Sequence, residues 1–221
     1  MQIPNRLKAI GDLIPDGANV ADIGADHGLL ELYLFHKKPN CKVLAIENKK
    51  GPLDRLLKSV GCLDNVTVSY SDGTNAISKE QNTLVLAGMG GENIVSILNK
   101  NPNKLISITR IVIDAHSFID EAREVIVNFG FEIESEQIVY EKKIYYVIIS
   151  FIRNISHKTY SKDELEFGVF LPKDPLYNEF KNTKLKELNK VKTALEKLEK
   201  SSEKLVEVND KIRRLTNYGQ N

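Results

Sequence analysis

The residues best suited to chemistry lie between Asn19 and Glu31, in the stretch NVADIGADHGLLE, which combines two aspartates, a histidine and two glycines. Gly24 and Gly28 would let the backbone approach a ligand closely or adopt a positive φ. The carboxylates of Asp22 and Asp26 could orient polar groups or stabilise a developing positive charge. We therefore interpret this stretch as a cofactor-binding loop, with a structural turn that carries an incidental histidine as the alternative.

A strand before this loop and a helix after it must hold it in place. Val20, Ala21 and Ile23 are typical of a strand that is buried on both faces. The residues from Leu29 to Leu34 favour a helix, whose first amide groups would point at a ligand above the loop. Open α/β sheets bind their ligands at this carboxyl edge of the strands.

The pattern of a buried strand followed by a helix recurs along the chain. We predict a helix at 4–14, further strands at 42–47, 65–70, 83–87 and 110–115, and helices at 52–60, 92–98 and 118–129. Two β-rich runs, 131–139 and 144–152, are separated by Tyr140 to Lys143 and indicate an antiparallel hairpin. These elements predict an α/β protein with the Rossmann-like sheet of a class I methyltransferase, in which five parallel βα units are closed by the hairpin.

A helical organisation begins after residue 155. Ser161 and Glu164 have the spacing of a capping box, and the apolar positions from Leu188 to Leu215 follow the three-four spacing of a coiled coil. One continuous helix would place polar residues in the apolar seam, so we predict an antiparallel helical hairpin broken near residues 200–202. From these residues alone it could be a packing appendage, a dimerisation element or a substrate-binding element. The predicted domains are residues 1–155 and residues 156–221.

The composition is that of an ordinary globular protein. Of the 221 residues, 42% are hydrophobic and 28% are charged. No apolar run approaches the roughly 20 residues that span a bilayer, and the first residues lack a signal-peptide pattern, so we expect a cytoplasmic location and no membrane partner. Cys41 and Cys62 lie in no metal-binding pattern and are expected to be reduced thiols, so no metal site is predicted.

The charge is distributed unevenly between the two predicted domains. Residues 1–153 contain 17 Lys or Arg against 19 Asp or Glu, a net charge of −2, whereas residues 154–221 contain 14 against 11, a net charge of +3. The second part is therefore the better candidate for contact with a polyanion.

Four predicted strand ends would meet at one edge of the sheet, where a single cofactor could contact all of them. Asp22 and the loop after it would approach the amino-acid part of the cofactor. Glu47 could accept hydrogen bonds from ribose hydroxyls, and Asp72 with Gly73 would meet the adenine edge.

The first loop discriminates between two cofactor classes. A dinucleotide fingerprint needs glycine at the positions of Asp26 and Leu29, and a pyrophosphate would meet a carboxylate there. The sulfonium and ammonium groups of S-adenosylmethionine tolerate nearby carboxylates, so the loop favours S-adenosylmethionine.

The ends of the fourth and fifth strands could serve the methyl acceptor. Gly88 to Gly91 would let an aromatic ring lie close to the backbone, with a flexible turn as the alternative. Asp114, His116 and Ser117 could line an acceptor pocket, although a lone histidine is more often a surface residue. The chain has no hydrolase-type arrangement of nucleophile and base, and no phosphate-binding GxxxxGK[ST] loop.

The motifs DIGADHG (Asp22 to Gly28), Glu47 with Gly51-Pro52, Asp72-Gly73 and AGMGG (Ala87 to Gly91) resemble those of the bacterial tRNA adenine-22 N1-methyltransferase family. The resemblance extends over nearly the whole chain. It implies S-adenosyl-L-methionine as the methyl donor, S-adenosyl-L-homocysteine as the product, and N1 of an adenosine at position 22 in the tRNA D-arm as the acceptor. It also implies that the coiled-coil C-terminal domain helps to hold tRNA.

The resemblance also assigns roles to residues. The aspartate and histidine of the family's first loop match Asp26 and His27, which are the predicted catalytic residues. Together with the strand ends, the resemblance implies that the cofactor is bound by Asp22, Gly24, Ala25, Gly28, Glu47, Asn48, Asp72, Gly73, Ala87, Gly88, Met89 and Gly90. The chain departs from the family at Leu29-Leu30-Glu31, where Tyr-Leu-Pro is usual, and at Asp114-Ala115-His116, where Gln-Pro-Asn is expected.

The chemistry of such an acceptor can be argued independently. Adenine N1 is a neutral lone pair, so attack on a sulfonium methyl group needs alignment more than a strong base. Methylation makes the ring cationic, and a carboxylate near the exocyclic amine, for which Asp26 is our candidate, would stabilise that charge or accept a proton. N1 lies on the pairing edge, so the base must be unpaired or flipped out.

Two other functions are compatible with the sequence. One is a class I methyltransferase that acts on a different acceptor, and the other is a non-catalytic module that binds S-adenosylmethionine and recruits a partner through its coiled coil. For the leading interpretation we expect a monomer that binds tRNA and not DNA, with a dimer through the coiled coil as the alternative.

Overall fold

The computed structural model describes residues 2–154, 156, 158–197 and 203–219. The chain divides into two compact units, Met1–Thr159 and Tyr160–Asn221. The boundary lies slightly beyond the one predicted after residue 155.

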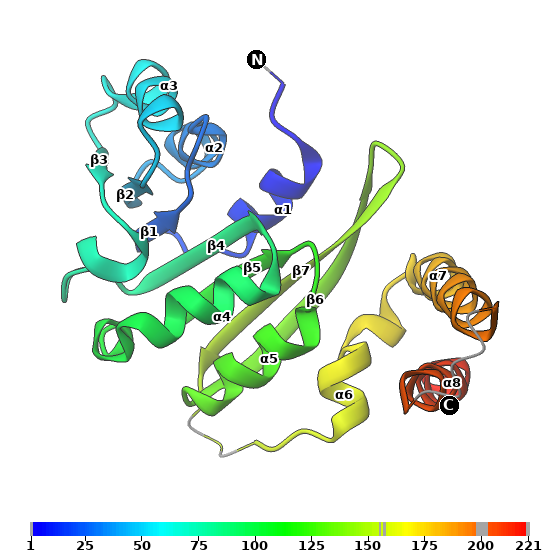
Figure 1. Cartoon of the computed structure of the whole chain (residues 1–221). Helices are drawn as coiled ribbons and strands as arrows, with labels where there is room; N and C mark the ends of the chain where they lie inside the picture. The colour runs from blue at the N-terminus through cyan, green and yellow to red at the C-terminus, as the bar shows by residue number, and fades with distance from the viewer. Residues whose placement is uncertain (1, 155, 157, 198–202, 220–221) are drawn as a thin grey trace. The chain divides into compact units, whose positions relative to one another are not determined.

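The first unit is built on a seven-stranded sheet with the order β3-β2-β1-β4-β5-β7-β6 (Figure 1). The first five strands pair in parallel, and β7 is antiparallel to both β5 and β6. This topology confirms the predicted class I methyltransferase sheet, five parallel βα units closed by a hairpin. The strands are β1 (Asn19–Ile23), β2 (Lys42–Glu47), β3 (Val66–Tyr70), β4 (Thr83–Met89), β5 (Arg110–Ala115), β6 (Phe131–Glu141) and β7 (Ile144–Arg153).

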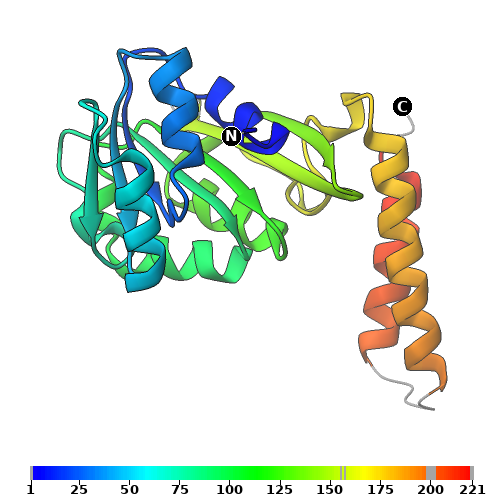
Figure 2. The same ribbon diagram turned by 90° about the horizontal axis from the view of Figure 1, so that it is seen from above.

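Helices cover both faces of this sheet (Figure 2). Helices α1 (Asn5–Asp12), α2 (Leu29–Lys37) and α3 (Lys50–Val60) pack on one face, where their apolar side chains share two cores with alternate strand residues. Helices α4 (Gly91–Lys100) and α5 (Ile119–Asn128) lie on the other face. The apolar run of β1 is therefore covered on both sides, as predicted.

Some boundaries differ from the sequence-based prediction. Helix α3 begins at Lys50 rather than Pro52, because a proline is tolerated in a first turn, where its missing N–H has no helical partner. Strand β4 continues to Met89 through a register shift against β5, whereas the prediction ended it at Ala87. Helix α1 ends at Asp12, two residues before the predicted end at Ile14.

The β6–β7 hairpin turns over two residues instead of the predicted four. Lys142 and Lys143 both have positive φ values, 50° and 66°. Two consecutive residues with positive φ match the twist of the flanking strands, so Tyr140 and Glu141 can continue the ladder, opposite Tyr145 and Ile144.

The second unit is helical and contains α6 (Lys162–Phe167), α7 (Tyr177–Lys197) and α8 (Glu203–Asn217). The predicted capping box is confirmed: the Glu164 amide donates to Ser161 Oγ at 3.2 Å, and the Ser161 amide donates to the Glu164 carboxylate at 2.7 Å. Lys181 Nζ, near the start of α7, donates to the carbonyls of Thr216 and Tyr218 at 2.9 and 2.7 Å. The two long helices therefore run antiparallel, as predicted, while the predicted break at residues 200–202 lies outside the described residues.

Arg214 links α8 to α6 through ion pairs. Its guanidinium pairs with Asp210 on the same helix at 2.8 Å and with Asp163 and Glu166 of α6. No helix among the described residues is long and apolar enough to cross a membrane.

Candidate active site

A cavity of about 540 Å³ opens at the carboxyl ends of β1, β2, β3 and β4. It lies where ligands of open α/β sheets bind. Nine of the predicted site residues line it: Gly24, Asp26, Glu47, Asn48, Asp72, Gly73, Ala87, Gly88 and Met89. Asp22, Ala25, His27, Gly28 and Gly90 are not among its lining residues.

Backbone hydrogen bonds hold the first loop in place, and three of its residues have positive φ values. The amides of Gly24 and Ala25 donate to the Ile46 carbonyl of β2, at 2.8 and 3.2 Å. Gly24 has a φ of 83°, Asp26 of 42° and Gly28 of 70°. The positive φ of Asp26, uncommon for a residue with a side chain, turns its carboxylate to the cavity rim.

Gly28 has a packing role in this structure. A Cβ at this position would lie 2.6 Å from Cγ1 of Val60 and 3.2 Å from Cδ1 of Leu56, both on α3. The glycine thus lets the start of α2 approach α3 closely, and any larger residue would push the two helices apart.

Asp26 lies at the cavity rim between two potential cations. Its Oδ1 accepts a hydrogen bond from Arg55 Nη2 at 2.8 Å, and its Oδ2 is 3.4 Å from His27 Nε2. The Asp26 side chain is 46% exposed, so the pairing with Arg55 orients the carboxylate more than it stabilises the fold. The adjacent His27 is also half exposed, at 54%.

Asp22 is buried behind the loop, where it meets a second buried carboxyl group, Glu31 of α2. Apart from the Asp22 carboxyl group, Glu31 has no hydrogen-bond partner for its side-chain oxygens among the residues that the structure describes. Burial raises the pKa of Asp22 to about 6, and burial together with the charge of Asp22 raises the pKa of Glu31 well above its usual range. Two such carboxyl groups can hydrogen-bond only if one keeps a proton.

Glu47 ends β2 in a geometry suited to accepting hydroxyl groups. Its Oε1 accepts the backbone N–H groups of Asn48 and Lys49, each at 2.9 Å. Oε2 has no donor among the described residues, and the side chain borders the cavity. A carboxylate held in this way can accept two hydroxyl groups of a ribose.

Asp72 follows β3 and hydrogen-bonds with Asn48. Its Oδ1 accepts from Asn48 Nδ2 at 3.2 Å, and its Oδ2 pairs with Lys100 at the end of α4. The hydrogen bond from Lys100, followed by that from Asn48, lowers the pKa of Asp72, so this carboxylate stays ionised at neutral pH. The next residue, Gly73, has a φ of 55° and turns the chain along the cavity wall.

The end of β4 is held against the end of β5. The His116 amide donates to the Met89 carbonyl at 2.9 Å, and the Gly91 amide donates to the Ser117 carbonyl at 2.8 Å. A Cβ on Gly91 would lie 2.1 Å from the Phe118 carbonyl oxygen, so only glycine fits there. Gly88, with a φ of 72°, faces the cavity, while Gly91 serves this close packing.

The end of β5 carries an ion pair that sequence reasoning did not find. Asp114 is fully buried, and its Oδ2 pairs with Arg6 Nη1 of α1 at 2.6 Å. The two residues are 108 positions apart, so no local pattern links them. Arg55 and Lys100, which pair with Asp26 and Asp72, also lacked a sequence signal, because helix periodicity does not show which exposed cation will meet which carboxylate.

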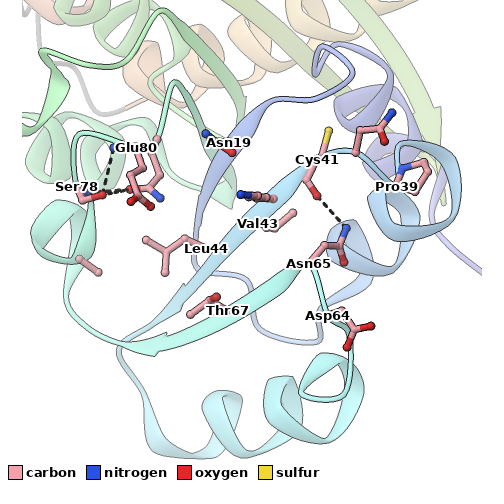
Figure 3. Close-up of a pocket in the computed structure, with 14 residues that line it drawn as sticks. Asn19, Pro39, Cys41, Val43, Leu44, Asp64, Asn65, Thr67, Ser78 and Glu80 are labelled. Carbon is pink, nitrogen blue, oxygen red and sulfur yellow. Dashed lines mark hydrogen bonds between the residues drawn. The ribbon is translucent and has the colours of Figure 1, made fainter.

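A second cavity, of about 650 Å³, lies at the opposite edge of the sheet (Figure 3). Asn19 at the start of β1, Asn65 just before β3, and Ser78 and Glu80 before β4 are among its lining residues. It contains none of the predicted site residues and no glycine-rich loop. We therefore place the functional site at the smaller cavity, where the strand ends and the glycine loops converge.

Residues 3–149 match the model of the family described as "Methyltransferase domain". The chain belongs to this methyltransferase family. It is 29% identical over 155 residues to the tRNA (adenine(22)-N(1))-methyltransferase of Bacillus subtilis, an alignment that covers 68% of this chain and 65% of that protein. The chain thus spans about two thirds of the length of this curated relative, and the similarity confirms the resemblance that the DIGADHG and AGMGG motifs indicate.

Solved structures extend the likeness to the whole chain. Sp1610 of Streptococcus pneumoniae, in complex with S-adenosyl-L-methionine, has a TM-score of 0.80 and 26% identity, and the match covers 97% of this chain and 98% of that one. TrmK of M. capricolum, in complex with S-adenosyl-homocysteine, has a TM-score of 0.84 and 23% identity, with 99% and 98% covered. The helical second unit is therefore part of the shared fold.

Proposed function

We propose that this protein transfers a methyl group from S-adenosyl-L-methionine to N1 of the adenosine at position 22 of tRNA. The observation that carries the proposal is the convergence of Gly24, Glu47, Asp72 and Gly88 on one cavity at the carboxyl edge of the sheet. The name of the Bacillus subtilis relative supplies the acceptor.

The residues of the cavity fit this cofactor. A side chain at Gly24 would point at Met89, since its Cβ would lie 3.4 Å from the Met89 Cε, and one at Gly73 would meet Ile97 at 3.5 Å. The two glycines therefore keep open a space that side chains would fill. Glu47 would hold the ribose hydroxyls, Asp72 and Asn48 would border the adenine, and the first loop would hold the amino-acid part. The bound cofactor supplies an electrophilic methyl group.

Asp26 and His27 are the proposed catalytic residues. Asp26 would accept a hydrogen bond from the exocyclic amine of the adenine, orienting N1 and stabilising the positive charge that methylation creates on the ring. Arg55 and His27 would keep this carboxylate directed at the cavity rim. Because N1 is a neutral lone pair, alignment contributes more than proton removal.

The second unit is the proposed tRNA clamp, and residues 1–155 the catalytic domain. Lys186, Lys190 and Lys197 lie on one face of α7, together with Asn189 and Thr193. Such a row of lysines with an amide and a hydroxyl group suits the phosphate backbone of RNA. We further propose that the protein acts as a monomer. Because its proposed substrate is tRNA, we propose that it acts in the cytoplasm.

The test is to incubate unmodified tRNA transcript with the protein and labelled S-adenosyl-L-methionine, then to locate the methyl group by nuclease digestion and mass spectrometry. Label on N1 of adenosine 22, and none on a transcript with guanosine at that position, supports the proposal. Cofactor binding without transfer to RNA would support a binding module instead. Transfer to an added protein or small molecule would support a methyltransferase with another acceptor.

A further inference from the structure

A polar cluster lies beyond the end of β4, on the far side of the cavity from Asp72. The strand order β3-β2-β1-β4-β5 places the end of β5 next to Gly88 and Met89. Four side chains meet there: Arg6 of α1, Asp114 of β5, His116 directly after β5, and Tyr146 of β7. None of them is needed to hold the proposed cofactor.

The Arg6 guanidinium is held rigidly. Its Nη1 donates to Asp114 at 2.6 Å, and its Cζ lies 5.3 Å from the centre of the Tyr146 ring. His116 closes the cluster, with its Nε2 3.7 Å from Asp114 and its ring edge-on to Tyr146 at 5.6 Å. A buried carboxylate on one side and an aromatic ring on another fix the plane and direction of the guanidinium.

The same guanidinium also borders the cavity wall. A Cβ on Gly88 would lie 3.6 and 3.7 Å from the two terminal nitrogens of Arg6. Gly88 itself lines the cavity at the end of β4, where the methyl group of the cofactor would lie. The missing side chain of Gly88 therefore leaves the guanidinium beside the path by which an acceptor would reach the methyl group.

Arg6 has donors to spare. A guanidinium has five N–H donors, of which one binds Asp114, and the Arg6 side chain remains 23% exposed. Asp114, by contrast, is fully buried, and its Oδ1 has no hydrogen-bond partner among the described residues. Asp114 thus fixes the guanidinium from the protein interior, and the Arg6 N–H groups that do not bind Asp114 can bind an anion.

We propose that Arg6, positioned by Asp114 and Tyr146, binds a phosphate group of the RNA next to the adenosine that is methylated. This inference rests on the proposed function. A nucleotide turned out of its stack brings a flanking phosphate close to the reacting base, and a fixed guanidinium is the side chain best suited to bind a phosphate through two hydrogen bonds. The carboxylates of Asp26, Glu47 and Asp72 around the cavity would otherwise repel that phosphate.

The test compares three versions of the full-length protein: the wild type, Arg6→Lys, and the double variant Arg6→Gln with Asp114→Asn. The double variant removes the cation without leaving a buried unpaired charge, so it avoids the fold defect expected of Arg6→Ala. We expect kcat/KM for tRNA to fall about 10- to 100-fold in the double variant and less in Arg6→Lys. Affinity for S-adenosyl-L-methionine should stay within about twofold of wild type. Lys8→Ala, which removes a cation from the same helix, is the matched control and should leave kcat/KM unchanged.

A phosphate contact is then tested directly with tRNA that carries one neutral methylphosphonate, on the 5′ or the 3′ side of the target adenosine. At one of these positions the substitution should slow the wild type about as much as loss of Arg6 does, and should slow the double variant little further. The proposal would be overturned if, at both positions, the losses in rate caused by the double variant and by the methylphosphonate multiplied when combined. It would also be overturned if the double variant lost cofactor binding and tRNA binding equally. Failure of the wild type to methylate unmodified tRNA would instead overturn the proposed function.

Discussion

Glu31→Gln should stabilise the protein at alkaline pH, because it removes a carboxyl group that the fold holds in an unfavourable place. Glu31 is completely buried, and apart from the buried Asp22 carboxyl group its side-chain oxygens have no hydrogen-bond partner among the described residues. A glutamine amide at this position could donate to the Asp22 carboxylate, so the pair would no longer need a shared proton to hydrogen-bond.

The sign of the effect follows from the direction of the pKa shifts. Both pKa values are raised in the folded protein, so the native state binds protons more tightly than the unfolded chain does. Stability is therefore greatest at low pH and falls as pH rises through the range between the unfolded and folded pKa values. For Asp22 this range runs from 3.8 to about 6, which corresponds to roughly 3 kcal/mol at about 1.4 kcal/mol per pH unit. For Glu31 the fall continues to higher pH.

Urea unfolding from pH 5 to pH 9 measures this effect, followed by far-ultraviolet circular dichroism because the chain has no tryptophan. At pH 8 the Glu31→Gln variant should be more stable than wild type by about 1 to 3 kcal/mol, with the difference shrinking towards pH 5. Glu124→Gln, an exposed change on α5, is the matched control and should follow the wild type at every pH. Parallel pH profiles for Glu31→Gln and wild type would refute the idea of a protonated buried pair.

Four further outcomes are expected. Asp26→Ala should largely abolish methyl transfer, while cofactor affinity measured by calorimetry stays within about tenfold of wild type, which is roughly 1.4 kcal/mol of binding free energy. Equal losses of methyl transfer and cofactor affinity would assign Asp26 to cofactor binding. Glu47→Ala should weaken cofactor binding by about 10- to 100-fold, through loss of the hydrogen bonds to ribose, and unchanged calorimetric affinity would remove Glu47 from the site. Gly28→Ala should lower the free energy of unfolding by about 1 to 3 kcal/mol, because the alanine Cβ would overlap Val60 and residue 28 has a positive φ. An unchanged midpoint of urea unfolding would contradict this packing role. Replacing Lys186, Lys190 and Lys197 together by glutamine should weaken tRNA binding and reduce its dependence on salt concentration, without changing cofactor affinity. If the salt dependence of tRNA binding is unaltered, this face of α7 is not the clamp.

The architecture could be derived from the sequence because it depends on local patterns. The run Val20 to Ile23 had to be a strand covered on both faces, and the recurrence of such runs with helices between them left one practical topology, a parallel sheet with right-handed crossovers. The carboxyl ends of parallel strands share one edge, so the sequence alone assigns Glu47 and Asp72 to a common site, and both line the cavity. The capping box at Ser161 was equally local, since its two partners are three residues apart.

The roles of individual side chains were decided by distant neighbours. The sequence assigns Asp22, Gly24 and Gly28 to the cofactor and Asp26 to the acceptor. The structure places Gly24 and Asp26 together at the cavity, buries Asp22 with Glu31, and packs Gly28 against Val60. The type of a residue does not reveal which way its side chain points when a loop has three positive φ values.

What the sequence by itself determined was the set of elements, their order and the edge of the sheet where the cavity opens, because hydrophobic periodicity and glycine placement act over a few residues. Tertiary structure alone decided the ion pairs around that edge. Arg6 reaches Asp114 across 108 positions, and Arg55 reaches Asp26 across 29. Such pairs depend on how helices pack against the sheet, and a long flexible cation carries no sequence signal for the carboxylate that it will meet.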